Sequence, residues 1–212
     1  MFKNGWTNEF YSNQIEKLNK DYSDIFSHLK SYEEKAKARY DQGEYWWELR
    51  QCAYYDLFDK PKIIFPNLQS SNKFCFDSES TYINAPAVFL PTDDLVLLGI
   101  LNSKVVWYFL KSICVVRSGG YIEVKPQYFE QIPIPDYEDS LAEPLKHLVK
   151  IIISLSKNIQ EKQNTFLSRI QSNLTIDKPS NKLKEFYNYD FKTFVSELKK
   201  KKITLSLKQQ DE

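Results

Sequence analysis

The pattern of apolar and polar positions changes along the chain and divides it into three successive regions. Up to about Arg39 the sequence is rich in Glu, Lys and Tyr, and its apolar side chains recur at the spacing of a helix, at Tyr22, Ile25, Phe26 and Leu29. This spacing predicts an amphipathic helix. We expect the helix to end before Gly43, because glycine readily adopts the left-handed backbone that closes a helix.

Between residues 45 and 135, short apolar runs alternate with polar turns, which is typical of a sheet. We expect strands at residues 62–65, 73–76, 82–83, 87–90 and 121–124. Two helices, at residues 95–101 and 105–113, are predicted to interrupt the sheet, with Asp93 as the N-cap of the first. Residues 132–135 read Ile-Pro-Ile-Pro and are expected to be extended, because each proline biases its predecessor away from helical geometry.

A capping-box signature, Ser-Leu-Ala-Glu, stands at residues 140–143 and precedes a long apolar seam. The seam steps by alternating fours and threes through Leu141, Leu145, Leu148, Ile152, Leu155 and Ile159, and resumes after Lys162 at Phe166 and Ile170. This heptad spacing predicts a helix over residues 141–170 that packs on another long helix. Residues 175–181 break the pattern, short helices should follow, and the charged end from Lys199 is expected to fray.

These elements together predict an α+β protein. Its centre is a mixed, largely antiparallel sheet domain with interspersed helices, flanked by an N-terminal helix and a long C-terminal heptad-patterned helix. We divide the chain into an N-terminal helical segment at residues 1–43, a sheet-containing domain at 44–137 and a C-terminal helical region at 138–212. With 42% hydrophobic and 15% aromatic residues, 212 residues suffice to bury one core.

Charge and cysteine content restrict the function classes. The 29 basic and 28 acidic residues balance, so any nucleic-acid surface must come from local clustering. Cys52, Cys75 and Cys114 stand singly, which predicts buried, reduced thiols rather than a disulfide framework or a metal site. No run is long and apolar enough to cross a membrane, and the start lacks a secretory apolar region. We therefore expect a cytoplasmic protein without a membrane partner.

Catalytic signatures are absent from the sequence. A methyltransferase that acts on an amino group needs a glycine-rich cofactor turn and an Asn-Pro-Pro-Tyr-like tetrapeptide, yet the chain has no Pro-Pro pair, and its one pair of adjacent glycines is Gly119 and Gly120. Phosphate-binding loops and nucleophile elbows are missing too. The chain is expected to bind rather than to catalyse, with no catalytic residue, no metal and no cofactor of its own.

Several phrases of the sequence, in their order and spacing, carry a family resemblance. They lie at residues 26–30, 39–50, 60–66, 97–103 and 132–135, and a Phe-Tyr-x-x-Asp-Phe phrase at 186–191 precedes a lysine-rich end. Together they resemble the TaqI-like C-terminal specificity domain of type IIG and related bacterial restriction-modification enzymes.

The resemblance implies a division of labour. A catalytic domain, absent from this chain, would bind S-adenosylmethionine and flip an adenine out of the duplex. The parent protein would then be an adenine-specific DNA methyltransferase, with or without endonuclease activity. This chain would recognise specific duplex DNA and position the target site for that catalytic domain.

The sharpest candidate for a DNA contact is the turn from Arg117 through Gly119, Gly120 and Tyr121, together with Lys125. Residues 103–127 carry four cationic side chains against one acidic residue, Glu123. Glycines let backbone amides approach phosphate, and an adjacent arginine can reach guanine bidentately. A tight turn with a solvated arginine is an equally good interpretation.

Two further segments carry candidate residues. Arg50 and Gln51 follow the Trp-Trp phrase, where Arg50 could contact DNA or pair with Glu48. The second segment is a polar loop with the amide and hydroxyl chemistry that reads adenine or phosphate, which an ordinary hairpin loop would also explain. Its candidates are Ser70, Asn72 and Lys73.

Two other functions remain open. In one, the heptad helix mediates protein interaction or homodimerisation without any DNA role. In the other, exposed tyrosines bind single-stranded nucleic acid or RNA, although most aromatic residues are expected to be core. The tyrosines considered for this role are Tyr45, Tyr54, Tyr55, Tyr82, Tyr108 and Tyr121.

Overall fold

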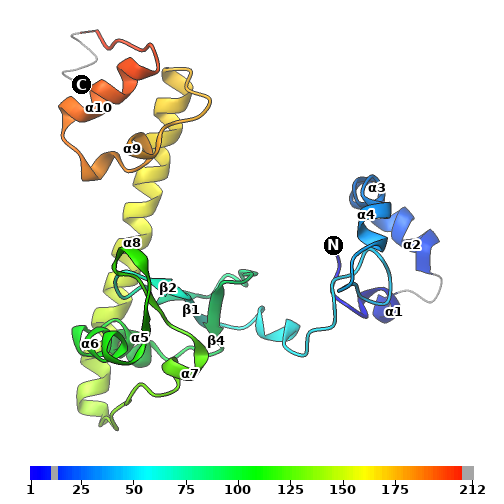
Figure 1. Ribbon diagram of the computed structural model, residues 1–212, viewed down its shortest axis with the longest axis horizontal. Coiled ribbons are helices and arrows are strands. Elements are labelled where there is room, and N and C mark those ends of the chain that lie inside the picture. Colours follow the sequence, from blue (N-terminus) through cyan, green and yellow to red (C-terminus); the bar gives the residue numbers. More distant parts are fainter. Residues whose placement is uncertain (11–13, 207–212) are drawn as a thin grey trace. The chain divides into compact units, whose positions relative to one another are not determined.

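The computed structural model describes residues 1–10 and 14–206 and confirms the predicted α+β class. The chain divides into two compact units, Met1–Ile134 and Pro135–Glu212. Figure 1 shows that the first unit holds the short helices and the strands, and that the second holds a long helix followed by short ones. The predicted three-part domain division stays a prediction.

The first unit begins with four short helices where one amphipathic helix was expected. They are α1 (Trp6–Phe10), α2 (Gln14–Asp21), α3 (Ser23–Lys30) and α4 (Glu33–Lys37). The helical spacing that begins at Tyr22 belongs mainly to α3, and Tyr22 itself precedes that helix with a non-helical backbone. Leu18, Phe26 and Trp47 form the buried cluster of this segment.

Gly43 does not close a helix, so that prediction was wrong. The last helix of the segment ends at Lys37, and Ala38 caps it with a right-handed backbone. Gly43 is instead needed for a close approach, because a Cβ built on it would lie 2.5 Å from the Leu49 carbonyl oxygen and 2.6 Å from the Glu48 Cβ.

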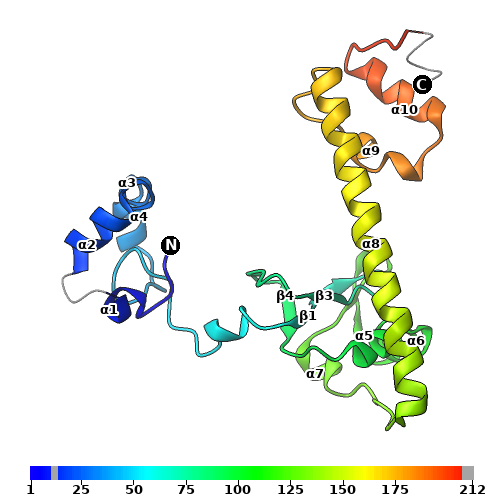
Figure 2. The ribbon, with the colours of Figure 1, turned by 180° about the vertical axis from the view of Figure 1, so that it is seen from behind.

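Two small antiparallel sheets follow in the chain, and the strands of the first are labelled in Figure 2. In the first, β1 (Lys62–Pro66) lies between β3 (Cys75–Asp77) and β4 (Ala87–Leu90). In the second, β6 (Ile122–Glu123) lies between β2 (Leu68–Gln69) and β5 (Val115–Val116).

Two of these strands depart from the sequence interpretation, and one predicted strand is missing. The strands β2 and β5 were not predicted, and the strand expected at residues 82–83 is irregular backbone. In this irregular segment the ring of Tyr82 stacks on Phe58, with centroids 4.9 Å apart. Cys114 is buried as expected, whereas Cys75 is exposed and Cys52 half-buried, so the prediction of three buried thiols was wrong.

The helices α5 (Leu95–Leu101) and α6 (Lys104–Ile113) confirm the two predicted within the sheet region. The N-cap of α5 is Asp94 rather than Asp93, since the Asp94 carboxylate accepts from the Val96 and Leu97 amides at 2.8 and 3.1 Å. In residues 1–10 and 14–206 no single helix has the length and apolarity of a membrane span. Only α5 and α6 taken together reach them, and they are bent by 60°.

The second unit is built on α8 (Asp139–Asn173), a helix of 35 residues that confirms the long predicted helix. The expected capping box is wrong, because the helix begins before it and Glu138 is the N-cap. After α8 come α9 (Asn181–Lys184), a 3-10 turn at Phe186–Asn188 and α10 (Phe191–Lys200). The expected fraying from Lys199 is also wrong as far as residue 206, since Leu205 packs into the unit's core. That core comprises Ile170, Ile176, Leu183, Leu198 and Leu205.

Candidate nucleic-acid interface

The turn with the strongest sequence signal joins β5 to β6. Val116 lies opposite Ile122, and the Arg117 amide donates to the Tyr121 carbonyl at 2.7 Å, which closes the turn. Gly119 and Gly120 both have a φ near +80°, a conformation that other residues rarely adopt. A Cβ on Gly120 would meet no atom within 4 Å, so the glycines serve the backbone conformation and the turn remains open to an approaching ligand.

Sheet pairing brings a second candidate loop to the same edge. Gln69, the last residue of β2, lies opposite Ile122, the first residue of β6. Because the strands are antiparallel, the polar loop that follows Gln69 and the turn that precedes Ile122 leave the sheet at one end. Two segments separated by more than forty residues in the sequence therefore form one surface, which we call the loop edge, composed of residues 70–73 and 117–121.

The polar loop is anchored to the start of α6. The Asn72 side-chain amide donates to the Ser103 carbonyl at 2.6 Å, and Ser103 is the N-cap of α6. The Lys73 backbone amide donates to the buried Gln69 side chain at 3.1 Å. The Asn72 amide group is thus already engaged in holding the loop, whereas the side chains of Ser70 and Lys73 are exposed.

Arg117 and Lys125 share one acidic partner. The Arg117 guanidinium donates to Glu123 Oε2, through Nε at 3.0 Å and through a closer Nη2 contact, and Lys125 Nζ lies 3.4 Å from Glu123 Oε1. The hydrogen bond from Arg117 is the main reason that the pKa of Glu123 lies below its ordinary value. Both cations remain about half exposed. To contact DNA, each must share or release the carboxylate.

A further candidate surface lies on α6 and is not among the contact residues predicted from the sequence. Lys104, Tyr108 and Lys111 are spaced four and three residues apart on α6, so they share one face of the helix. Tyr108 is 78% exposed, and neither lysine forms an ion pair within residues 1–10 and 14–206. No acidic residue occurs from residue 95 to residue 122. The positive charge of this region that no acidic side chain among the described residues neutralises therefore lies on α6. In the sequence, the spacing of residues 104, 108 and 111 is the pattern that indicates this surface.

Arg50 and Gln51 lie outside the loop edge, in the segment that leads into the sheet. The alternative pairing of Arg50 with Glu48 was wrong. Glu48 is buried, and its carboxylate accepts from the Thr7 and Gly5 amides at 3.0 and 3.3 Å, at the start of α1. The Arg50 side chain is exposed and makes no ion pair in the described part of the chain.

Three of the six tyrosines considered for base stacking make the following contacts within the protein. Tyr45 stacks on Trp47 with centroids 4.8 Å apart, Tyr82 stacks on Phe58, and the Tyr55 hydroxyl donates to the Arg50 carbonyl at 2.7 Å. Tyr108 and Tyr121 are exposed on the cationic region. Aromatic contacts from the cationic region to a nucleic acid would therefore come from these two side chains, while Tyr54 and Tyr82 are exposed outside that region.

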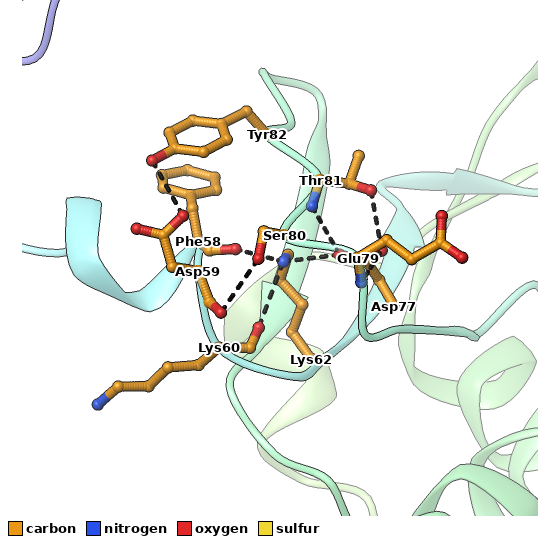
Figure 3. Close-up of polar contacts among 9 residues, drawn as sticks. All are labelled: Phe58, Asp59, Lys60, Lys62, Asp77, Glu79, Ser80, Thr81 and Tyr82. Carbon is orange, nitrogen blue, oxygen red and sulfur yellow. Dashed lines mark hydrogen bonds and ion pairs between the residues drawn. The ribbon is translucent and has the colours of Figure 1, made fainter.

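The other sheet, formed by β3, β1 and β4, contains an ion pair made by a buried lysine (Figure 3). Lys62 is fully buried, its Nζ lies 2.7 Å from Asp77 Oδ2, and it donates to the Phe58 carbonyl at 2.6 Å. Asp77 also accepts from the Thr81 amide at 3.0 Å and from the Thr81 hydroxyl at 2.8 Å. Burial alone would raise the pKa of Asp77, but the hydrogen bonds from Lys62 and Thr81 hold it at about 2.

Comparison with known proteins adds family information to this geometry. Residues 5–134 match the TaqI-like C-terminal specificity domain, and residues 138–212 match a domain of unknown function (DUF8810). The chain is also similar to the type II methyltransferase M.MjaIV of Methanocaldococcus jannaschii, at 25% identity over 157 residues. The match covers 68% of this chain and 51% of the relative, so the chain spans about half the length of that protein.

Proposed function

We propose, from the premise that the chain belongs to the TaqI-like C-terminal specificity domain family, that it recognises duplex DNA for a restriction-modification methyltransferase. The observation that carries the proposal is the joint surface of the loop edge and the outward face of α6. It gathers open loops, exposed cations and two exposed tyrosines on one part of the specificity-domain region.

The parts of this surface suit different tasks in recognition. Among the residues that the structure describes, Lys104 and Lys111 have no acidic partner, and we assign them to phosphate contacts that fix the register on DNA. Arg117, at the start of the turn, is the candidate for reading a guanine edge. Its bond to Glu123 supports a role in selectivity, because a ligand must offer better acceptors than the carboxylate before the guanidinium turns to it.

The chemistry is assigned to a partner. We propose that a separate catalytic half binds S-adenosylmethionine and methylates adenine, as in a type IIG-like enzyme with or without cleavage, and that this chain binds no cofactor. In titration calorimetry, S-adenosylmethionine should then give no saturable heat with this chain. Saturable one-to-one binding would contradict the proposal. Because such an enzyme acts on DNA in the bacterial cell, the proposal includes a cytoplasmic location.

A second candidate function is self-association through α8, which is favoured by a row of exposed apolar side chains on that helix. Homodimerisation and contact with the catalytic half are both proposals, and neither excludes a role in DNA binding.

The decisive test measures duplex binding as a function of salt. Replacing Lys104 and Lys111 together by glutamate should weaken binding to all sequences, and the slope of log affinity against log salt should fall by about one unit for each lost phosphate contact. The matched control exchanges Lys30 and Lys35 for glutamate, which makes the same charge change on exposed residues of other helices. Equal affinity and slope for the α6 variant and the control would remove α6 from the interface.

A further inference from the structure

The long helix α8 carries a row of apolar side chains that remain more than half exposed among the described residues. Five of them are between 55% and 71% exposed: Leu141, Leu148, Ile152, Leu155 and Ile159. At 1.5 Å per residue the row extends for about 27 Å along the helix. Single exposed apolar residues are ordinary, but a contiguous row of this length marks a surface that another element covers.

The spacing of the row specifies what kind of element covers it. With Leu145, Ile152 and Ile159 as a positions, the residues Leu141, Leu148 and Leu155 become d positions of a regular heptad. A seam that repeats every 3.5 residues stays in contact with a second helix that supercoils around it. The occupant that fits is therefore another long helix rather than a sheet or a small ligand.

The charges of α8 are compatible with a second copy of the same helix. Within the seam, charged side chains occupy outer positions, as Glu143, Lys150 and Lys157 do at position f. The flanking e and g positions, which decide pairing by charge in coiled coils, are uncharged there. They are Ala142, Val149 and Ser156 at e, and Pro144, Ile151 and Asn158 at g. No like-charge repulsion opposes self-pairing.

One register of self-pairing gives each of the six apolar seam positions an apolar partner. In an antiparallel pair, a positions of one helix face d positions of the other. If the two-fold axis lies at the level of residue 150, Leu141 faces Ile159 of the second copy. In the same register Leu145 faces Leu155 and Leu148 faces Ile152. Each contact is apolar, and Lys162, the next d position, falls outside the paired segment. A parallel pair continued by one step would place Lys162 against itself.

We propose that α8 pairs with α8 of a second copy of this chain as an antiparallel coiled coil in this register. The arrangement is two-fold symmetric, so one surface serves both partners. It deepens and rests on the self-association proposed above, and it does not depend on recognition of DNA.

The first experiment tests self-association of the full chain by light scattering and sedimentation equilibrium. The wild type should approach twice the monomer mass, and the Leu148→Glu, Ile152→Glu variant should stay at the monomer mass with unchanged helix content, since both side chains are exposed in the single chain. The matched control, Lys150→Glu with Lys157→Glu, alters the outer face and should remain a dimer. A monomeric wild type, or a seam variant that still dimerises, overturns the proposal.

The second experiment tests the register, in a chain whose three cysteines are replaced by alanine and whose folding is checked by circular dichroism. Leu145→Cys and Leu155→Cys chains carrying different tags are oxidised separately and as a mixture. The antiparallel register predicts disulfide dimers only in the mixture, because each residue lies about 15 Å along the axis from its own counterpart, beyond disulfide reach. Disulfides within each variant alone would show parallel pairing and overturn the register while leaving self-association intact. A dimer that links in neither way would remove α8 from the interface.

Discussion

Replacing Asp77 by asparagine should test how the sheet of β3, β1 and β4 is held together. The carboxylate accepts from the buried Lys62 ammonium and from Thr81, and its pKa lies at about 2 instead of the ordinary 3.8. At 1.36 kcal/mol for each pH unit, this depression corresponds to about 2 kcal/mol of folding free energy. Because the folded-state pKa is lowered, that contribution is present above about pH 4 and is lost as the pH falls toward 2.

The substitution also leaves the Lys62 ammonium buried without a charged partner. Breaking such a pair costs about 3–5 kcal/mol at neutral pH, more than the pH-dependent part alone, because the remaining charge has lost its compensation. Adding Lys62→Met to Asp77→Asn should recover much of this loss, since the double variant buries no unpaired charge.

Hydrogen exchange of the β1 amides, corrected for the intrinsic rate at each pH, measures this local stability in the intact chain. The wild type should lose protection between about pH 4 and pH 2, and Asp77→Asn should start lower at pH 7 and lack that acid-dependent loss. An Asp77→Asn chain with wild-type protection at neutral pH, or with the wild-type acid dependence, would refute the reasoning.

Three further predictions concern Arg117 with its neighbours Glu123 and Lys125, and the N-terminal segment. Lys125→Ala should weaken binding to all duplexes alike. Arg117→Ala, assayed together with the catalytic half proposed above, should cost about 1–3 kcal/mol on the recognised sequence and little on random DNA, as binding titrations would show. Wild-type affinity for both would remove the turn from the interface. Glu123→Gln should raise affinity for random duplex and steepen its salt dependence, because both cations lose their competing partner, and an unchanged slope would contradict this. Gly43→Ala should lower the melting stability of the N-terminal segment by about 1–3 kcal/mol, because its Cβ would overlap the Leu49 carbonyl, and unaltered calorimetric unfolding would count against that contact.

Elements encoded by local patterns could be predicted from the sequence. The heptad of α8 and the apolar runs of α5, α6 and β1 are local patterns, and each could be located without knowledge of a distant partner. The family resemblance could also be recognised from the sequence, because its motifs lie at fixed places along the chain. The match over residues 5–134 confirms it.

Tertiary structure decided what depends on a distant partner. The two-residue strands β2 and β5 have no periodicity and exist only because β6 pairs with both. Lys62 read as the polar start of a strand, and only the fold brings Asp77 and the Phe58 carbonyl around its ammonium. The loop edge likewise joins segments that are far apart in sequence, so its composition followed from strand pairing.

In the cationic surface, too, the sequence determined one feature and the tertiary structure determined another. The lack of acidic residues from 95 to 122 was visible in the sequence and located the positive charge. Packing then determined which cations are available, because Glu123 on β6 lies between Arg117 and Lys125, whereas Lys104 and Lys111 lie on the outward face of α6. A sequence states how many charges a segment carries, but the free energy of each charge depends on which groups folding places within a few ångströms of it.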